Sequence, residues 1–390
     1  MQEQAYRRKN RWLSENEDRR NKVNLENLST PCVLIDLGIV EQNIERMAQI
    51  AKKAGVDLRP HTKTHKIPYL ASRQIEKGAA GITVAKVSEA EVMAAHGIND
   101  IFVAYPIIGQ QKLKRITELN NRIRLIIGVD SLEGARALAQ AAVMAKQTIE
   151  VRLEVDTGFK RTGVQYDKAL GLAMEISGMA GLNLTGIYTF HHLIYQGERT
   201  HDREKAGLEE GTLMVTLAEE MKRAGLKITD ISVGSTPTAE YVANVPGITE
   251  IRPGTYIFND MIQVHNKSCT LADCAAKVLT TVVSAPSNKL AVIDGGNKTF
   301  STDCQPNNSP YFMKGYGLIE GVEDYALTRL TEEHGMLSAI NDDAARLEPG
   351  KLLTVIPNHV CTTINLHNKV YFVSGETVEE AVVEGRGMVY

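Results

Sequence analysis

The stretch Arg59-Pro60-His61-Thr62-Lys63-Thr64-His65-Lys66 follows a short apolar segment, Val56-Asp57-Leu58, and precedes a helical pattern that begins at Ile67. It therefore lies where a strand is expected to end and a helix to begin. Such junctions collect active-site groups in α/β folds. A solvated basic loop is the alternative interpretation of this charge run, but its position favours a functional loop.

Lys63 is the residue in this stretch that points to chemistry. A lysine at a strand end, crowded by other cations, has a lowered amine pKa and can attack a carbonyl to form a Schiff base. Enzymes that use pyridoxal phosphate require a lysine of this kind. We therefore take Lys63 as the candidate catalytic and cofactor-binding lysine.

Strands and amphipathic helical stretches alternate downstream of this run. Eight strands are predicted at 57–61, 81–85, 100–105, 124–129, 149–155, 184–190, 229–233 and 250–256. Helical patterns separate most of them, for example at 88–96, 112–119, 132–145, 168–177 and 209–224. This repeat implies a parallel sheet, and eight units in about 200 residues suit a closed (β/α)8 TIM barrel. An open doubly wound sheet is the alternative, but it requires a glycine-rich turn after its first strand that this sequence lacks.

The rhythm changes near residue 266. Residues 278–284, 290–293, 351–356 and 369–374 read as strands separated by Gly, Pro and Asn turns. We therefore predict a polar N-terminal arm over 1–28, a barrel over 29–265 and a β-rich C-terminal domain over 266–390. The early strand at 31–36 is left over from the barrel count, and we expect it either in the barrel or in the C-terminal domain.

Composition narrows the functional class. The chain has 390 residues, 43% hydrophobic and 23% charged, with a net charge of -3. These values are typical of a globular protein with a sizeable core and give no reason to expect nucleic acid or a membrane as partner. No apolar run approaches the ~18 residues that span a bilayer, and the charged first 24 residues lack a signal-peptide core. A cytoplasmic location is the default expectation. Five scattered cysteines do not suggest a disulfide framework.

The predicted strand ends place polar groups on one rim of the barrel. Small and hydroxyl residues after the last two strands would let backbone N–H groups and side chains approach a phosphate, and barrels often bind phosphate there. Each group alone also has a bland interpretation, such as a helix cap, a packed histidine or an ordinary turn. The candidates on this rim are His61, Lys63, Arg161, His191, His192, Ser235, Thr236, Arg252, Gly254, Thr255 and Tyr256.

A second constellation, Pro357-Asn358-His359-Val360-Cys361, lies in the predicted C-terminal domain. His359 and Cys361 are two residues apart, so on an extended segment both side chains face the same way. An imidazole and a thiolate suit zinc. Two protein ligands would leave positions open for water or substrate, as a catalytic metal requires. A structural role is the alternative, because such a short motif is weak by itself.

These motifs together resemble the D-threonine aldolase / D-serine dehydratase family, which are fold-type III, alanine-racemase-like pyridoxal phosphate enzymes. The resemblance extends from Ser29 to Tyr390. Its markers are Thr30-Pro31, the run 59–66, Asp156-Thr157-Gly158 with Arg161 and Gly163, Gly234-Ser235-Thr236-Pro237-Thr238, Glu250-Ile251-Arg252-Pro253-Gly254-Thr255-Tyr256, and the segment 357–361.

The resemblance implies roles for single residues. Lys63 matches the Schiff-base lysine, and Arg161 and Arg252 match arginines near the cofactor ring. Ser235, Thr236, Gly254 and Thr255 match the phosphate cradle. The pair His359 and Cys361 matches a divalent metal site, for which zinc is favoured over manganese or magnesium. The family also implies a homodimer with active sites near its interface.

Members of this family act on D-β-hydroxy amino acids. Dehydratases tend to have His-x-Cys, whereas aldolases have an aspartate at the position of Cys361, so the thiol favours a D-serine or D-3-hydroxyaspartate dehydratase that yields a 2-oxo acid and ammonia. In an aldolase, His191 or His192 would instead take the β-hydroxyl proton, and glycine and an aldehyde would form. A non-catalytic pyridoxal phosphate-binding homeostasis protein and a racemase are further alternatives. The segment at 190–195 departs from the Gly-His pattern of the family, which puts substrate contacts there in question.

Overall fold

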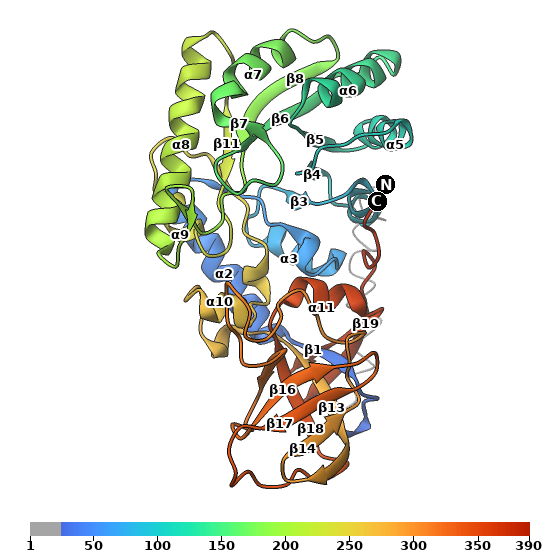
Figure 1. Ribbon diagram of the computed structural model, residues 1–390. Helices are drawn as coiled ribbons and strands as arrows, with labels where there is room; N and C mark the ends of the chain where they lie inside the picture. Colours follow the sequence, from blue (N-terminus) through green and yellow to red (C-terminus); the bar gives the residue numbers. More distant parts are fainter. Residues whose placement is uncertain (1–24) are drawn as a thin grey trace.

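The computed structural model describes residues 25–390 (Figure 1). The predicted polar arm, 1–28, therefore lies outside the described residues except for its last four. Leu25–Asn27 form a short 3-10 turn.

Eight parallel strands form the barrel. Neighbouring strands pair in the order β2-β12-β11-β8-β6-β5-β4-β3. A parallel bridge between His61 and Thr83 joins the two ends of this order, just beyond β2. The strands are β2 (Asp57–Leu58), β3 (Ile82–Val84), β4 (Asp100–Val103), β5 (Arg124–Val129), β6 (Ile149–Asp156), β8 (Leu182–Tyr188), β11 (Asp230–Val233) and β12 (Glu250–Ile251). All eight predicted strands are present, and the predicted (β/α)8 fold is confirmed.

Helices surround this sheet, as the alternating pattern predicts (Figure 1). They are α2 (Leu37–Ala54), α3 (Pro68–Glu76), α4 (Val87–Ala95), α5 (Gln110–Asn120), α6 (Leu132–Met144), α7 (Ala169–Ser177), α8 (Arg203–Arg223) and α9 (Ala239–Val242). The short helix α10 (Met261–His265) follows the barrel and lies beside the C-terminal part of the chain, where the Ile262 N–H donates to the Asn358 carbonyl (Figure 1). Short strands β7 (Val164–Gln165), β9 (Ile194–Tyr195) and β10 (Glu198–Arg199) lie in the loops of the rim. Strand interiors such as β5 are continuous buried apolar runs, which is typical of a sheet covered by helices.

Helix α2 connects the barrel to the second part of the molecule. The side chain of Asp36 caps its first turn by accepting a hydrogen bond from the N–H of Ile39 at 3.0 Å. Gly55 ends the helix with φ of 71°, a left-handed conformation that glycine adopts without strain. Val40 and Ile44 pack into the C-terminal core, whereas Met47 and Ala51 pack into the barrel core.

The C-terminal sheet holds β1 together with strands from the last third of the chain. β1 (Cys32–Asp36) pairs antiparallel with β13 and parallel with β19, so the strand left over from the barrel count lies here. The remaining elements are β13 (Ala276–Ser287), β14 (Leu290–Ile293), β15 (Gly317–Ile319), β16 (Tyr325–Leu330), β17 (Gly335–Ala339), β18 (Leu352–Pro357), α11 (Val360–Leu366), β19 (Lys369–Ser374) and β20 (Thr377–Val382). Our sequence prediction missed β15, β16, β17 and β20, which are short or carry charged residues that weaken the strand pattern.

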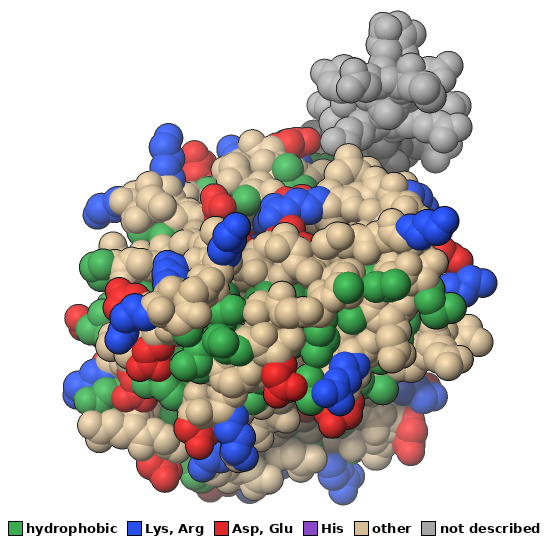
Figure 2. All heavy atoms as spheres, turned by 90° about the horizontal axis from the view of Figure 1, so that it is seen from above, with side chains coloured by type: hydrophobic (Ala, Val, Ile, Leu, Met, Phe, Trp, Pro, Cys, Tyr) green, Lys and Arg blue, Asp and Glu red, His purple; other side chains and the backbone are tan. Residues whose placement is uncertain are grey.

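Figure 2 shows the molecule from above, at the end of the barrel away from the C-terminal sheet. Lysine and arginine side chains alternate there with aspartate and glutamate, so neither sign of charge dominates this face. No helix among residues 25–390 is long and apolar enough to cross a membrane.

Candidate active site

A cavity of about 880 Å³ opens at the C-terminal ends of the barrel strands, between the barrel and α11. This is the rim where barrel enzymes place their chemistry. The predicted site residues on its walls are His61, Lys63, Arg161, His192, Ser235, Thr236, Arg252, Gly254, Thr255, His359 and Cys361. The structure therefore brings together residues from most of the predicted motifs.

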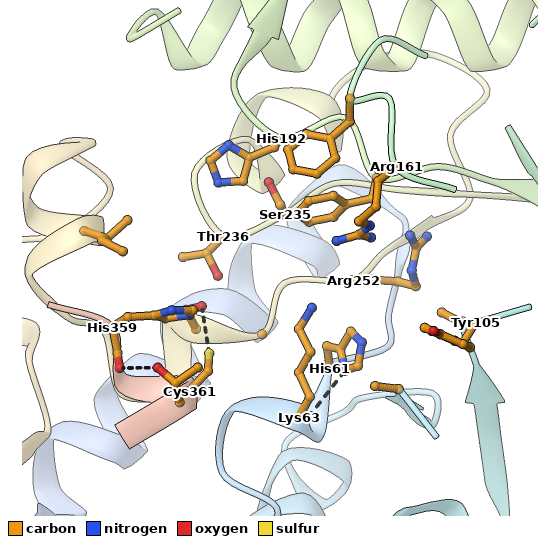
Figure 3. A pocket seen from close by; sticks show the side chains of 18 of the residues that line it. His61, Lys63, Tyr105, Arg161, His192, Ser235, Thr236, Arg252, His359 and Cys361 are labelled. Atoms are coloured by element: carbon orange, nitrogen blue, oxygen red, sulfur yellow. Dashed lines mark hydrogen bonds between the residues drawn. The ribbon is translucent and has the colours of Figure 1, made fainter. Parts of the chain in front are cut away.

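Lys63 lies on a 3-10 turn, Thr62–Thr64, that follows β2. His61 begins this turn, and its Nδ1 accepts a hydrogen bond from the N–H of Lys63 at 3.4 Å. The Lys63 amine points into the cavity, between the arginines and the His359–Cys361 wall (Figure 3). Burial lowers the pKa of Lys63, and Arg161 and Arg252 lower it further, although Cys361 and Glu89 oppose this. The direction agrees with the sequence expectation, but burial rather than neighbouring cations is the largest cause.

Glu89, on α4, supports this turn and was not identified from sequence. Its carboxylate is fully buried and accepts hydrogen bonds from the Thr62 hydroxyl at 2.8 Å and the Ala85 N–H at 3.1 Å. Burial raises the pKa of Glu89, while Lys66 and these hydrogen bonds oppose the shift. Glu89 thereby fixes the residue next to Lys63.

Arg252 is held rigidly at the floor of the cavity. Its guanidinium donates to the Ser232 hydroxyl at 2.7 Å and to the Thr189 carbonyl at 2.6 Å. Ser232 in turn donates to Glu250 at 2.5 Å, inside the barrel. Arg252 therefore enters the cavity as a positioned cation.

Glu250 is the centre of a buried ion network beneath Arg252. Its two oxygens accept from Arg152 at 2.6 Å and from Arg59 at 2.7 Å, and all three side chains are at most 3% exposed. Burial opposes ionisation of Glu250, but the two arginines lower its pKa to about 2. Asp100 also pairs with Arg59, at 2.5 Å. These charges explain why Arg59 and Glu250 belong to the site motifs although neither lines the cavity.

Ser235, Thr236, Gly254 and Thr255 lie together on one side of the cavity, as the sequence predicts. A Cβ on Gly254 would lie 3.0 Å from the His61 carbonyl, so glycine is needed for this close approach. None of the four is acidic, and three carry hydroxyl groups. This set of neutral donors fits a phosphate group.

Glu210, on α8, holds this cradle from behind. It is fully buried and accepts from the Gly234 N–H at 2.8 Å and the Thr238 hydroxyl at 3.1 Å. Gly234 has φ of 82°, a left-handed conformation that permits the tight turn after β11. Burial raises the pKa of Glu210.

Two predicted residues do not reach the cavity. The ring of His191 is fully buried, with Nδ1 2.9 Å from the Thr157 hydroxyl and Nε2 2.9 Å from the Ile194 carbonyl. The Tyr256 hydroxyl accepts from Gln74 at 2.9 Å in the barrel core. Both side chains are thus engaged in packing, and neither is free to contact a bound molecule.

His192 does face the cavity, opposite its neighbour. Its backbone has φ of 59°, which turns the ring toward Phe159 and Phe190. Arg161 lies over the same aromatic group, 4.7 Å from the centre of the Phe190 ring. Burial lowers the pKa of His192 to about 4, with further lowering by Arg199 and Lys63. His192 is therefore a neutral imidazole at pH 7.

Glu154 and Tyr188 also line the cavity and were missed from sequence. They lie inside β6 and β8, where their polar groups interrupt apolar runs. The Tyr188 hydroxyl donates to Glu154 at 3.0 Å, and the Thr162 hydroxyl donates to the other oxygen at 2.8 Å. Burial raises the pKa of both groups.

His359 and Cys361 converge, but not on an extended segment. That expectation is wrong, because His359 is the N-cap of α11 and Cys361 lies in the first turn of that helix. The Cys361 Sγ lies 3.3 Å from the Thr64 hydroxyl, next to Lys63 in sequence. The metal-pair candidates and the lysine turn therefore form one continuous wall (Figure 3).

His359 and Cys361 shift each other's pKa values in opposite directions. Burial opposes ionisation of the Cys361 thiol, but His359 and the hydrogen bond with Thr64 outweigh it and lower the thiol pKa. Burial likewise opposes charging of His359, but Cys361 and Asp303 raise its pKa well above the usual value. A thiolate and an imidazole fit a zinc ion. Among residues 25–390 no group of three or more His, Cys, Asp or Glu side chains is arranged to hold a metal.

The fold and this cavity define an enzyme of the alanine-racemase-like class, which uses pyridoxal phosphate. Residues 35–261 match the family model for the alanine racemase N-terminal domain, and residues 275–373 match the putative serine dehydratase domain. The chain thus belongs to the D-threonine aldolase / D-serine dehydratase family and is a pyridoxal phosphate-dependent lyase.

Curated relatives span nearly the whole chain. A D-threonine aldolase from Arthrobacter sp is 31% identical over 359 residues, covering 91% of this chain and 92% of the relative. The D-threo-3-hydroxyaspartate dehydratase of Delftia sp. is 34% identical over 355 residues, covering 86% and 92%. A D-serine dehydratase from Dictyostelium discoideum is 26% identical over 381 residues, covering 91% and 96%.

Solved structures of related enzymes support the same family assignment. The Delftia dehydratase superimposes with a TM-score of 0.84 at 32% identity, covering 91% of this chain and 97% of that chain. Structures of D-threo-3-hydroxyaspartate dehydratase also include a histidine-to-alanine mutant and a cysteine-to-alanine mutant in the metal-free form.

Proposed function

We propose that this chain is a metal-dependent dehydratase of D-β-hydroxy amino acids, such as D-serine or D-3-hydroxyaspartate, that forms a 2-oxo acid and ammonia. The observation that carries the proposal is the Cys361 thiol beside His359, on the same wall as Lys63. A related D-threo-3-hydroxyaspartate dehydratase has been solved as a cysteine-to-alanine mutant in the metal-free form, which is compatible with a metal role for a cysteine in such enzymes.

The cofactor half of the cavity would hold pyridoxal phosphate. Ser235, Thr236, Gly254 and Thr255 would receive its phosphate, and Arg161 and Arg252 would lie near its ring. When bound, the cofactor supplies an electron sink for negative charge that develops at the substrate α-carbon. The Arg252 guanidinium is a cation that can only donate hydrogen bonds, so it would disfavour protonation of a ring nitrogen placed against it.

Lys63 is proposed as the proton acceptor at the α-carbon. Its lowered pKa keeps a larger fraction of the amine unprotonated at neutral pH, which a general base needs. The 3-10 turn and Glu89 hold it in place. The neutral ring of His61 lies beside it without adding positive charge, because burial keeps the His61 pKa well below its usual value.

His359 and Cys361 are proposed to hold the divalent metal, with zinc favoured by the imidazole–thiolate pair. A metal there supplies Lewis acidity for departure of the β-hydroxyl group. Thr64 contacts Cys361 and directly follows Lys63 in the chain, so the proposed proton acceptor and the proposed leaving-group site share one fixed turn. This arrangement serves loss of water across the α- and β-carbons.

A retro-aldol cleavage is the second candidate. It is favoured by His192, a neutral imidazole on the cavity wall that could accept the β-hydroxyl proton, and by the aldolase relatives. The products in that case would be glycine and an aldehyde.

Incubation of the purified, zinc-loaded and cofactor-loaded protein with D-serine, D-threonine and D-3-hydroxyaspartate tests both candidates. Ammonia and 2-oxo acid in equal amounts are expected. Glycine with an aldehyde would replace the dehydratase by the aldolase, and no turnover of any substrate would overturn both. Loading with manganese or magnesium instead of zinc identifies the metal. We also propose a homodimer, from the family resemblance, which light scattering of the same sample checks.

A further inference from the structure

Asp303 lies directly behind the His359 ring. It comes from the long loop between β14 and β15, and its Oδ2 is 2.5 Å from His359 Nδ1. Because Nδ1 is engaged by a carboxylate, Nε2 is the nitrogen left for a metal. Asp303 is itself fixed, since it accepts a hydrogen bond from the Ser301 hydroxyl, and the Thr362 hydroxyl lies 3.5 Å away.

The backbone of the pair is held from another direction. Asp260 is fully buried at the start of α10, and its Oδ2 accepts from the Val360 N–H at 3.0 Å. Thr64 contacts the thiol of Cys361 at 3.3 Å. Of these three neighbours, Asp303 is the one that contacts the imidazole itself, so it fixes the ring orientation and the tautomer.

We propose that Asp303 is a positioning residue for the metal site, which presents His359 Nε2 to the ion. The proposal rests on the metal role of His359 and Cys361 proposed above. Asp303 is not assigned as a third ligand, because no three such side chains among the described residues are arranged to hold a metal. A carboxylate on the far nitrogen of a ligand histidine fixes the ring and strengthens its donor atom.

The test is the zinc affinity of the cofactor-loaded, metal-stripped protein, measured by competition with a chromophoric chelator. Asp303→Ala is expected to weaken zinc binding by roughly 10- to 100-fold, the usual cost of losing such an outer partner. Asp303→Asn should lose less, because the amide oxygen can still accept from the Nδ1 hydrogen. Excess zinc should restore turnover of Asp303→Ala.

The matched control is Asp342→Ala, which removes a carboxylate that is 90% exposed and pairs with Lys289 in the same part of the fold. It should bind zinc as the wild type does. Thermal unfolding and the visible absorbance of the cofactor should be equal in all variants, which separates positioning from misfolding.

Wild-type zinc affinity in Asp303→Ala would overturn the inference. A loss as complete as that of His359→Ala, without rescue by excess zinc, would also overturn it in favour of direct coordination. If the wild type itself binds no zinc, the proposed metal role fails first, and that result is distinguishable because it does not depend on Asp303.

Discussion

The two walls of the cavity are built in different ways. The barrel wall carries Lys63 and Arg252 and is backed by buried ion pairs around Glu250 inside a closed sheet. The C-terminal wall carries His359 and Cys361 and is held by single hydrogen bonds from separate segments. In the proposed roles, cofactor binding would rest on the framework of the barrel, whereas metal binding would depend on how the two parts of the chain meet.

The largest effect is expected from replacing Lys63, the proposed catalytic residue of the barrel wall. Lys63→Ala should lower turnover by roughly 10³-fold or more, because it removes both the proton acceptor and the cofactor linkage. The visible spectrum of the purified protein should change in parallel. Lys77→Ala, at the exposed end of α3, is the control and should keep both. A wild-type spectrum in Lys63→Ala would contradict the assignment.

Glu250→Gln changes the buried ion network that supports the same wall, and it leaves the proposed catalytic residue in place. Removing this charge leaves Arg59 and Arg152 buried without their shared partner, which should cost about 3–5 kcal/mol in the free energy of unfolding. Urea denaturation measures the loss. The exposed pair of Glu333 and Lys298 provides the control, because Glu333→Gln should change stability by only about 0–1 kcal/mol. Equal losses in the two variants would remove the distinction.

The C-terminal wall should be separable from the barrel wall. Cys361→Ala, or chelation of the wild type, should lower dehydration by about 100-fold, since Lewis-acid assistance contributes several kcal/mol. The cofactor spectrum should stay, because none of the cradle residues changes. Zinc should restore the chelated wild type but not the variant. Full activity after verified metal removal would show that the pair is not a metal site.

The smallest effect concerns pH and the packing behind the lysine turn. His65 is fully buried, and burial lowers its pKa to about 4. The unfolded chain has an ordinary histidine pKa of ~6.5, so it takes up the proton first as the pH falls. The free energy of unfolding therefore declines between pH 6.5 and pH 4, and the loss reaches about 2 kcal/mol at pH 5. His65→Gln should lack this part of the slope. Denaturation of both proteins at a series of pH values measures it, and parallel slopes would refute the role of His65.

Sequence reasoning located the barrel side well because its signals are local. Each predicted strand is a buried apolar run, and the cavity residues follow strand ends, so order along the chain translates into position on one rim. Neighbouring residues were harder to separate. Whether His191 or His192 faces the cavity depends on the positive φ of His192, which no sequence pattern reveals.

The supports of the site were beyond prediction for a different reason. Asp303 lies in an irregular loop with no periodicity, and its partner is 56 residues away in sequence. Glu89 and Glu210 occupy helix positions that read as ordinary solvent-facing charges until the fold buries them. The prediction of an extended segment at His359 and Cys361 was wrong because α11 begins at Val360. This helix has only seven residues, which is too short for a clear helical pattern in the sequence.

The pairing of β1 with β13 and β19 has a consequence for biosynthesis. β1 is the first strand of the described residues and has its hydrogen-bonding neighbours at the far end of the chain, so it stays unpaired until the residues of the barrel have been made. Contacts that close such long loops form late. The C-terminal sheet can therefore close around β1 only after β13 and β19 have been made, and a chain released before β19 would carry β1 without its parallel partner.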